Sequence, residues 1–205
     1  IEPGAINWMT AGRGIVHSER KPASLRGSTY VNHGLQLWAA LPREFEEVAP
    51  SFAHTPAADI PELVVDGAKV RVLIGEAFGR KSPVATFSQT LYLDVQLPAG
   101  AMLQLPPVCA ELAVYAVDAS LGVDGSTQAA QTMAVLTPGV TSTLAAPDAA
   151  ARFVVIGGEP LDAPRHMWWN FVSSRKERIV QAADDWEAGR FAPVPGETEF
   201  IPLPE

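Results

Sequence analysis

The segment ELAVYAVDASLGV, Glu111 to Val123, carries the pattern that decides the fold class. It is rich in Val, Leu and Tyr, the composition of a strand with a buried face. Similar segments recur along the chain, several alternate with the period of two of half-buried strands, and turn signals such as LPAG and VDG separate them. Repeated short strands at this spacing predict a β-sandwich, jelly roll or barrel. The other strands are expected at Lys69–Phe78, Gln89–Leu97, Thr132–Gly139 and Arg152–Glu159.

One helix is expected, from Ser174 to Ala188. The chain has 18 prolines and 16 glycines, which leave little room for long helices. Ser174 and Glu177 have the spacing of a capping box, and Gly189 supplies a helix stop. Leu41–Pro50 contains a weaker helical signal. The apolar positions that share one face of the predicted helix are Ile179, Ala182, Ala183 and Trp186.

A proline-rich stretch divides the chain. Ala49–Pro61 contains three prolines and few strand-forming residues, so it is interpreted as a linker. The predicted domains are therefore residues 1–50, a linker at 51–61, and a larger domain at 62–205 that includes the helix. The first part, at about fifty residues, is small for an independent β-domain.

Charge and composition exclude several classes of partner. A net charge of −8 and a pI near 5.0 argue against a nucleic-acid-binding surface, which needs clustered Lys and Arg. No apolar run approaches the roughly 18 residues of a membrane span, so no membrane partner is expected. The single cysteine, Cys109, excludes an internal disulfide framework and fits a buried strand residue in a reducing compartment. The expected location is cytoplasmic.

The most suggestive chemistry lies in the segment GIVHSER, Gly14 to Arg20. In an extended segment, the side chains of His17 and Glu19 would project from one face. An imidazole and a carboxylate can share a divalent transition metal, but two ligands are too few for a tight site. Taken alone, this pattern fits a hydrogen-bonded surface pair better than a metal site.

Longer stretches extend the comparison. The runs PGAINWMTAGRGIVHSE (Pro3–Glu19), NHGLQLWAALP (Asn32–Pro42) and the C-terminal stretch Gly157–Phe191 resemble the pirin family of the cupin superfamily. The resemblance covers nearly the whole chain. It departs at Asn7, where the family usually has glutamine.

The resemblance implies an all-β bicupin, with two facing β-sandwich (jelly-roll) domains, a C-terminal α-helix and one metal in the N-terminal domain. In the family, a His-x-His pair on an earlier strand and a later His and Glu hold that metal. The later two carry over onto His17 and Glu19, whereas no His-x-His occurs in this sequence. We therefore expect the chain to begin inside its first domain, which is incomplete here. The expected cofactor is one divalent transition metal, iron first, with Mn, Ni, Cu and Zn as alternatives.

The remaining candidates are interpreted as structural. His33 is expected in a strand or turn and His54 solvated in the linker. His166, next to Trp168 and Trp169 in the sequence, is expected to pack at the domain junction. Arg13, between two glycines, is expected to brace the turn through backbone hydrogen bonds, with anion binding as the alternative. The second domain is expected to bind no metal, because Cys109-Ala110-Glu111 stands where a cupin has its first histidine pair.

Three functions follow from the resemblance. The first is a quercetin 2,3-dioxygenase-type oxidoreductase that opens a flavonol with dioxygen, with Glu19 as a catalytic base. Its apolar cleft would be lined by Trp8, Met9 and Trp38, for which core packing is the alternative. The second function is a non-enzymatic, metal-dependent regulatory or protein-binding module, whose partner is a protein. The third is a cupin without metal that binds or isomerises carbohydrate.

Overall fold

The computed structural model describes residues 1–204, and the chain divides into two compact units. The first unit comprises Ile1–Met9 and Phe52–Pro160, and the second comprises Thr10–Ser51 and the chain from Leu161 onward. These units are defined by contacts and do not test the predicted domain boundaries at residues 51–61, which stay a prediction.

The first unit is a sandwich of two antiparallel sheets. The larger sheet has six strands in the order β12-β9-β14-β7-β4-β3. The smaller sheet has four, in the order β11-β10-β13-β8. The strands of the larger sheet are β3 (Glu62–Val65), β4 (Ala68–Ile74), β7 (Thr90–Leu97), β9 (Glu111–Ala116), β12 (Met133–Val135) and β14 (Ala151–Gly158). Those of the smaller sheet are β8 (Met102–Leu105), β10 (Leu121–Val123), β11 (Ser126–Gln128) and β13 (Ser142–Ala145).

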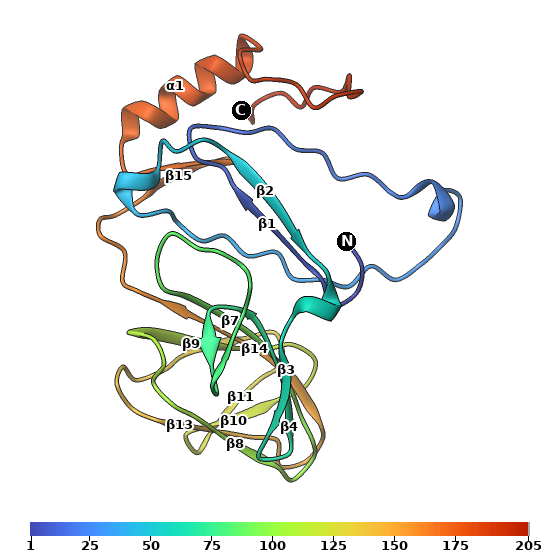
Figure 1. The fold of residues 1–205 in the computed structure, drawn as a ribbon, viewed down its shortest axis with the longest axis vertical. Coiled ribbons are helices and arrows are strands. Elements are labelled where there is room, and N and C mark those ends of the chain that lie inside the picture. The colour runs from blue at the N-terminus through green and yellow to red at the C-terminus, as the bar shows by residue number, and fades with distance from the viewer. Residues whose placement is uncertain (205) are drawn as a thin grey trace. The chain divides into compact units, whose positions relative to one another are not determined.

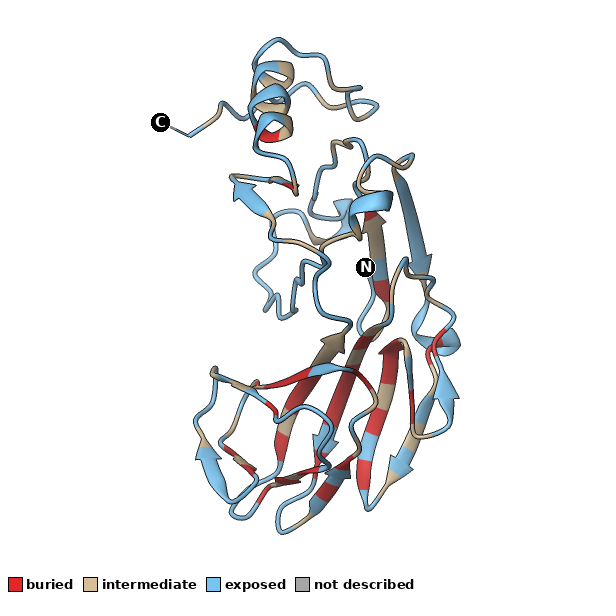
Figure 2. Cartoon of the chain, turned by 90° about the vertical axis from the view of Figure 1, so that its left-hand side faces the viewer, coloured by how far each residue is buried: buried red, intermediate tan, exposed pale blue. Residues whose placement is uncertain are grey.

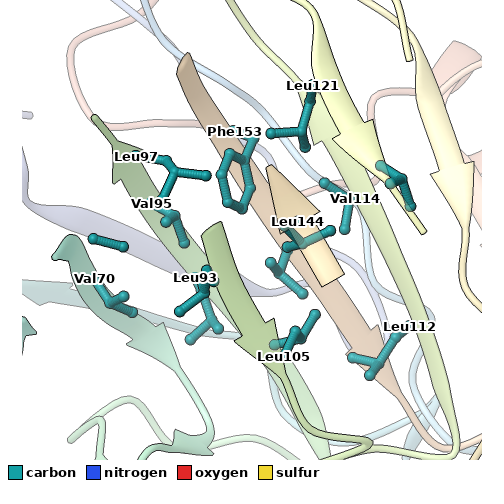
Figure 3. Close-up of a cluster of buried hydrophobic side chains, with 14 of the residues drawn as sticks. Val70, Leu93, Val95, Leu97, Leu105, Leu112, Val114, Leu121, Leu144 and Phe153 are labelled. Atoms are coloured by element: carbon teal, nitrogen blue, oxygen red, sulfur yellow. The ribbon is translucent and has the colours of Figure 1, made fainter. Parts of the chain in front are cut away.

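The core of this sandwich lies between the two sheets. Strand β7 shows how the sequence builds it, because Leu91, Leu93, Val95 and Leu97 alternate onto the buried face. One cluster of buried side chains joins both sheets, and Figure 3 shows Phe153 and Leu144 within it. Figure 2 shows the buried residues, coloured red, gathered on the strands of the sandwich. Each stretch predicted as a strand is in β-structure, but two are divided. Glu111–Val123 forms β9 and β10, which lie in different sheets, and Lys69–Phe78 forms β4 and the short strand β5 (Glu76–Ala77).

Shorter elements complete the first unit. Strands β1 (Ile6–Thr10) and β2 (Ser51–Thr55) form a two-stranded sheet, visible in Figure 1. Strands β5 (Glu76–Ala77) and β6 (Arg80–Lys81) form another, and a 3₁₀ turn covers Ala57–Asp59. Strand β2 lies inside the stretch interpreted as a linker from its three prolines. Those prolines stand outside β2, so they do not prevent its pairing.

The second unit has little regular structure before its C-terminal part. Its first segment contains only 3₁₀ turns at Ala23–Leu25 and Arg43–Phe45 within the described chain, the latter inside the predicted helical signal. Strands β15 (His166–Trp168) and β16 (Phe171–Ser173) form a hairpin, and helix α1 (Lys176–Glu187) follows. Over residues 1–204, no helix is long and apolar enough to cross a membrane.

Helix α1 begins differently from the prediction. Arg175 is the N-cap residue, and no side chain caps the helix, so the predicted capping box of Ser174 and Glu177 is wrong. The Ser174 backbone N–H and hydroxyl both donate to the Glu46 carboxylate instead. The other end agrees with prediction: Gly189 has a φ of +64° and donates its N–H to the Trp186 carbonyl.

Candidate functional site

The two candidate ligands lie in the irregular segment that follows β1. His17 and Glu19 are both exposed, and neither lies in a strand. Among residues 1–204, no hydrogen bond or ion pair involves either side chain. The proposed surface pair between them is therefore not formed, and both side chains are available to a ligand.

Their immediate neighbours are firmly held. Ser18 Oγ donates a hydrogen bond to Glu197 Oε1 at 3.0 Å. The Arg20 guanidinium donates to both carboxylate oxygens of Glu197, with the Nε bond at 2.8 Å. Its NH2 group also lies 2.8 Å from Glu199. Residues 18 and 20 thus meet the same carboxylate, which is what the two-residue alternation of an extended segment predicts. His17 and Glu19 are then expected on the opposite side.

Two glycines shape the turn that precedes this segment. Gly12 has a φ of +51°, and a Cβ there would lie 2.1 Å from the Val48 carbonyl oxygen, so only glycine fits. Gly14 has a φ of +130° and packs against the Phe191 ring. Between them, the Arg13 N–H donates to the Val48 carbonyl at 3.0 Å. The expectation that Arg13 braces a turn through its backbone is confirmed.

Helix α1 reaches the same turn through Arg178. This guanidinium donates from NH2 to the Arg13 carbonyl at 3.0 Å and from Nε to Glu47 Oε1 at 2.9 Å. The hydrogen bond from Arg178 is the main reason that the pKa of Glu47 lies below its ordinary value, with burial opposing the shift. The turn before the candidate ligands is thus tied to the helix by a backbone contact and an ion pair.

A second carboxylate, Glu46, organises the chain before the helix. It accepts hydrogen bonds from the Ser173 hydroxyl and from Ser174, and Arg165 Nε lies 2.8 Å from its Oε1. That N–H forms no hydrogen bond, so the close approach is an ion pair between two nearly buried side chains. Arg165 also donates to Asp162.

The other histidines do not converge on His17. His33 is exposed and outside any strand. His54 is exposed as expected, but lies in β2 and contacts Asn7 Oδ1 through Nδ1 at 2.7 Å. His166 is exposed in β15, so the prediction that it is packed is wrong. Across residues 1–204, no group of three or more His, Cys, Asp or Glu could hold a metal.

The donor chemistry of His17 and Glu19 fits a divalent transition metal, but their number does not complete a site. The described residues therefore do not form a metal centre by themselves.

The residues predicted to line a substrate cleft differ in their surroundings. Trp8 is partly buried and packs against the small core of Ile6, Ile60, Leu73 and Ile74. Trp38 is 56% exposed, and it lies in the irregular segment of the second unit. The packing alternative therefore holds for Trp8.

Sequence reasoning missed Glu197, Glu46 and Arg178. Glu197 is 177 to 179 positions from its partners, and no helical or strand period joins residues so far apart. The only local signal is the alternation of Glu197 and Glu199 in the run GETEF.

The sandwich, with its packed interior and short antiparallel strands, places the chain in the cupin class of β-proteins. Family profiles agree: the pirin profile matches residues 1–39, and the pirin C-terminal cupin domain matches residues 92–192. A pirin-like protein of Caulobacter vibrioides is 44% identical over 207 residues, covering 100% of this chain and 71% of the relative. The chain belongs to the pirin family, and the predicted all-β cupin fold with a C-terminal helix is confirmed.

Two further relatives extend the comparison. Mouse pirin is 39% identical over 192 residues, covering 91% of this chain and 64% of the relative. The crystal structure of quercetin 2,3-dioxygenase from Acinetobacter baumannii has a TM-score of 0.84 and 29% identity, covering 100% of this chain and 68% of that chain. The chain thus spans roughly two thirds of the length of these relatives.

Proposed function

We propose that this chain is part of a pirin that opens a flavonol with dioxygen, as a quercetin 2,3-dioxygenase does. The observation that carries the proposal is the structural similarity to the Acinetobacter dioxygenase, which extends over the whole of this chain. The proposed cofactor is one divalent transition metal, iron first, with His17 and Glu19 as two of its ligands. The exposure of both side chains and their lack of partners in residues 1–204 support this assignment.

The chain's own contribution to the chemistry is a proton acceptor. Glu19 is proposed as the base that takes the proton of a flavonol hydroxyl, because a carboxylate without an internal partner can approach that hydroxyl within hydrogen-bond distance. The remaining metal ligands are proposed to be a His-x-His pair, which this sequence does not contain. The presence of a single cysteine, which excludes an internal disulfide framework, supports the proposed cytoplasmic location.

The proposal is tested by following quercetin absorbance and oxygen uptake together. The assay uses a chimera in which a pirin N-terminal segment carrying His-x-His precedes Ile1, supplied with Fe²⁺. Glu19→Gln is expected to lower the rate by about 10²-fold or more, the usual contribution of a positioned base. The matched control is His33→Ala, another exposed residue of the same unit, which should leave the rate within about twofold of the parent. Metal loading without quercetin turnover in the parent chimera would contradict the enzymatic proposal and favour a regulatory module.

A further inference from the structure

The C-terminal segment lies against the residues that alternate with the candidate ligands. The Glu197 carboxylate accepts hydrogen bonds from Ser18 Oγ and from the Arg20 guanidinium. Glu199 adds an ion pair to the same guanidinium. A planar guanidinium paired with both oxygens of one carboxylate fixes orientation as well as distance. One acidic side chain thus holds two positions of the segment 17–20.

The C-terminal segment is itself fixed to helix α1. Trp186 Nε1 donates to the Ile201 carbonyl at 2.8 Å, and its indole stacks on the Phe200 ring with centroids 5.4 Å apart. The Glu197 N–H closes a turn onto the Val194 carbonyl at 3.1 Å. The carboxylate that meets Ser18 and Arg20 is therefore carried by a segment with its own anchors, which can restrain the segment 17–20.

We propose that Glu197 is a positioning residue for His17 and Glu19. By holding Ser18 and Arg20 on one side of an extended segment, it keeps the two intervening side chains together on the other side. Without this restraint, an exposed segment with no strand partners would sample many backbone conformations, and the two donors would separate. The role assigned to the donors rests on the proposed function, whereas the restraint itself rests only on the contacts.

The restraint is tested by backbone ¹⁵N relaxation in the 205-residue chain, which reports the mobility of residues 17–20 directly. Glu197→Gln should lower the order parameters of these residues from the range of a rigid backbone, about 0.85, toward that of a flexible one, about 0.6 or less. The matched control, Glu187→Gln, changes an exposed carboxylate of α1 and should leave those order parameters unchanged. The charge swap Arg20→Glu with Glu197→Arg should restore the high order parameters that each single change lowers. Unchanged order parameters in Glu197→Gln would overturn the restraint.

The positioning role is tested by metal affinity in the chimera that carries the His-x-His segment. Co²⁺ is the probe, because its visible absorption reports ligand geometry. Glu197→Gln should weaken Co²⁺ binding by about tenfold and change the absorption, and the charge swap should recover both. Lower order parameters with unaltered Co²⁺ binding would overturn the positioning role while leaving the restraint in place. If His17→Ala also leaves Co²⁺ binding unaltered, it is the proposed function that fails.

Discussion

Asp94, a buried charge in strand β7, is neutralised by one arginine. Arg152 donates to its two carboxylate oxygens from Nε and NH2, each at 2.8 Å, and the Asp94 side chain is 7% exposed against 43% for Arg152. Replacing Arg152 therefore has a different consequence from replacing Asp94. A carboxylate left alone in the sheet has lost its solvation, whereas a guanidinium left alone can still meet water.

This asymmetry predicts unequal costs for the two single changes. Arg152→Met should lower the free energy of unfolding by about 2 kcal/mol or more, because it leaves the buried Asp94 carboxylate without its ion-pair partner. Asp94→Asn should cost about 1 kcal/mol, since the amide still accepts a hydrogen bond and the arginine is half exposed. Urea unfolding at pH 7 measures both. Equal costs would show that Asp94 is better solvated than its burial indicates.

Cys109 gives a second prediction at the residue level. The thiol is buried, and burial, helped by nearby Glu159, raises its pKa. A raised thiol pKa leaves less thiolate at pH 8, and thiolate is the reactive species. Iodoacetamide should therefore label the native protein slowly and the urea-unfolded protein fully, as mass spectrometry can follow. Cys109 lies in a bend just before β9 and not in the strand itself, so native labelling at the unfolded rate would contradict the burial of the thiol.

At the level of elements, helix α1 is joined to the chain before β2 by Glu47. Its carboxylate pairs with Arg178 and also lies 2.6 Å from Arg175 NH2. The folded-state pKa of Glu47 is below the ordinary value of 4.5, chiefly through the Arg178 hydrogen bond. A depressed carboxyl pKa contributes stability that is fully present above 4.5 and is lost as the pH falls through the lower, folded value.

The pH dependence of this tie can be measured. Glu47→Gln should lower the free energy of unfolding by about 0.5–1 kcal/mol at pH 7, a modest value because the pair is partly exposed. The difference in unfolding free energy between the variant and the parent protein should shrink as the pH is lowered below 4.5, the ordinary pKa of the carboxyl. Glu44→Gln, an exposed carboxylate in the 3₁₀ turn Arg43–Phe45 just before Glu47, is the control and should show no such trend. A constant difference from pH 7 to pH 3 would contradict the ion pair.

The elements that the sequence predicts well are those governed by local periodicity. The alternation Leu91, Leu93, Val95, Leu97 specifies β7 without any knowledge of its partners, and Gly189 ends α1 because its backbone conformation suits glycine. The helix start is mispredicted because the Ser174 hydroxyl donates to Glu46, from a distant part of the chain, and so does not cap the helix. Strand β2 is missed for a related reason, since β1 supplies its pairing.

At the scale of the whole molecule, the candidate site also has a part that the local sequence predicts and a part that depends on distant contacts. Residue type and spacing single out His17 and Glu19, and their open surroundings agree with availability for a ligand. The contact of Arg20 with Glu197 brings together two ends of the chain, and no pattern within either segment could predict it. The sequence thus identifies the chemical groups, whereas their restraint depends on chain topology.

The last prediction concerns the metal and follows from the donor count. Only His17 and Glu19 are expected as ligands in this chain, and no group of three donors occurs in residues 1–204. The 205-residue chain should therefore retain little divalent metal after dialysis, because two-ligand chelation leaves the other coordination positions to water.

Elemental analysis of that chain and of the chimera with the His-x-His segment, side by side, measures the difference. The chimera should hold about one metal per chain, and His17→Ala should remove it, since each ligand lost from a small set weakens the whole site. If the 205-residue chain alone retains one tightly held metal, another histidine must be a ligand, and His33, His54 and His166 become the residues to replace next.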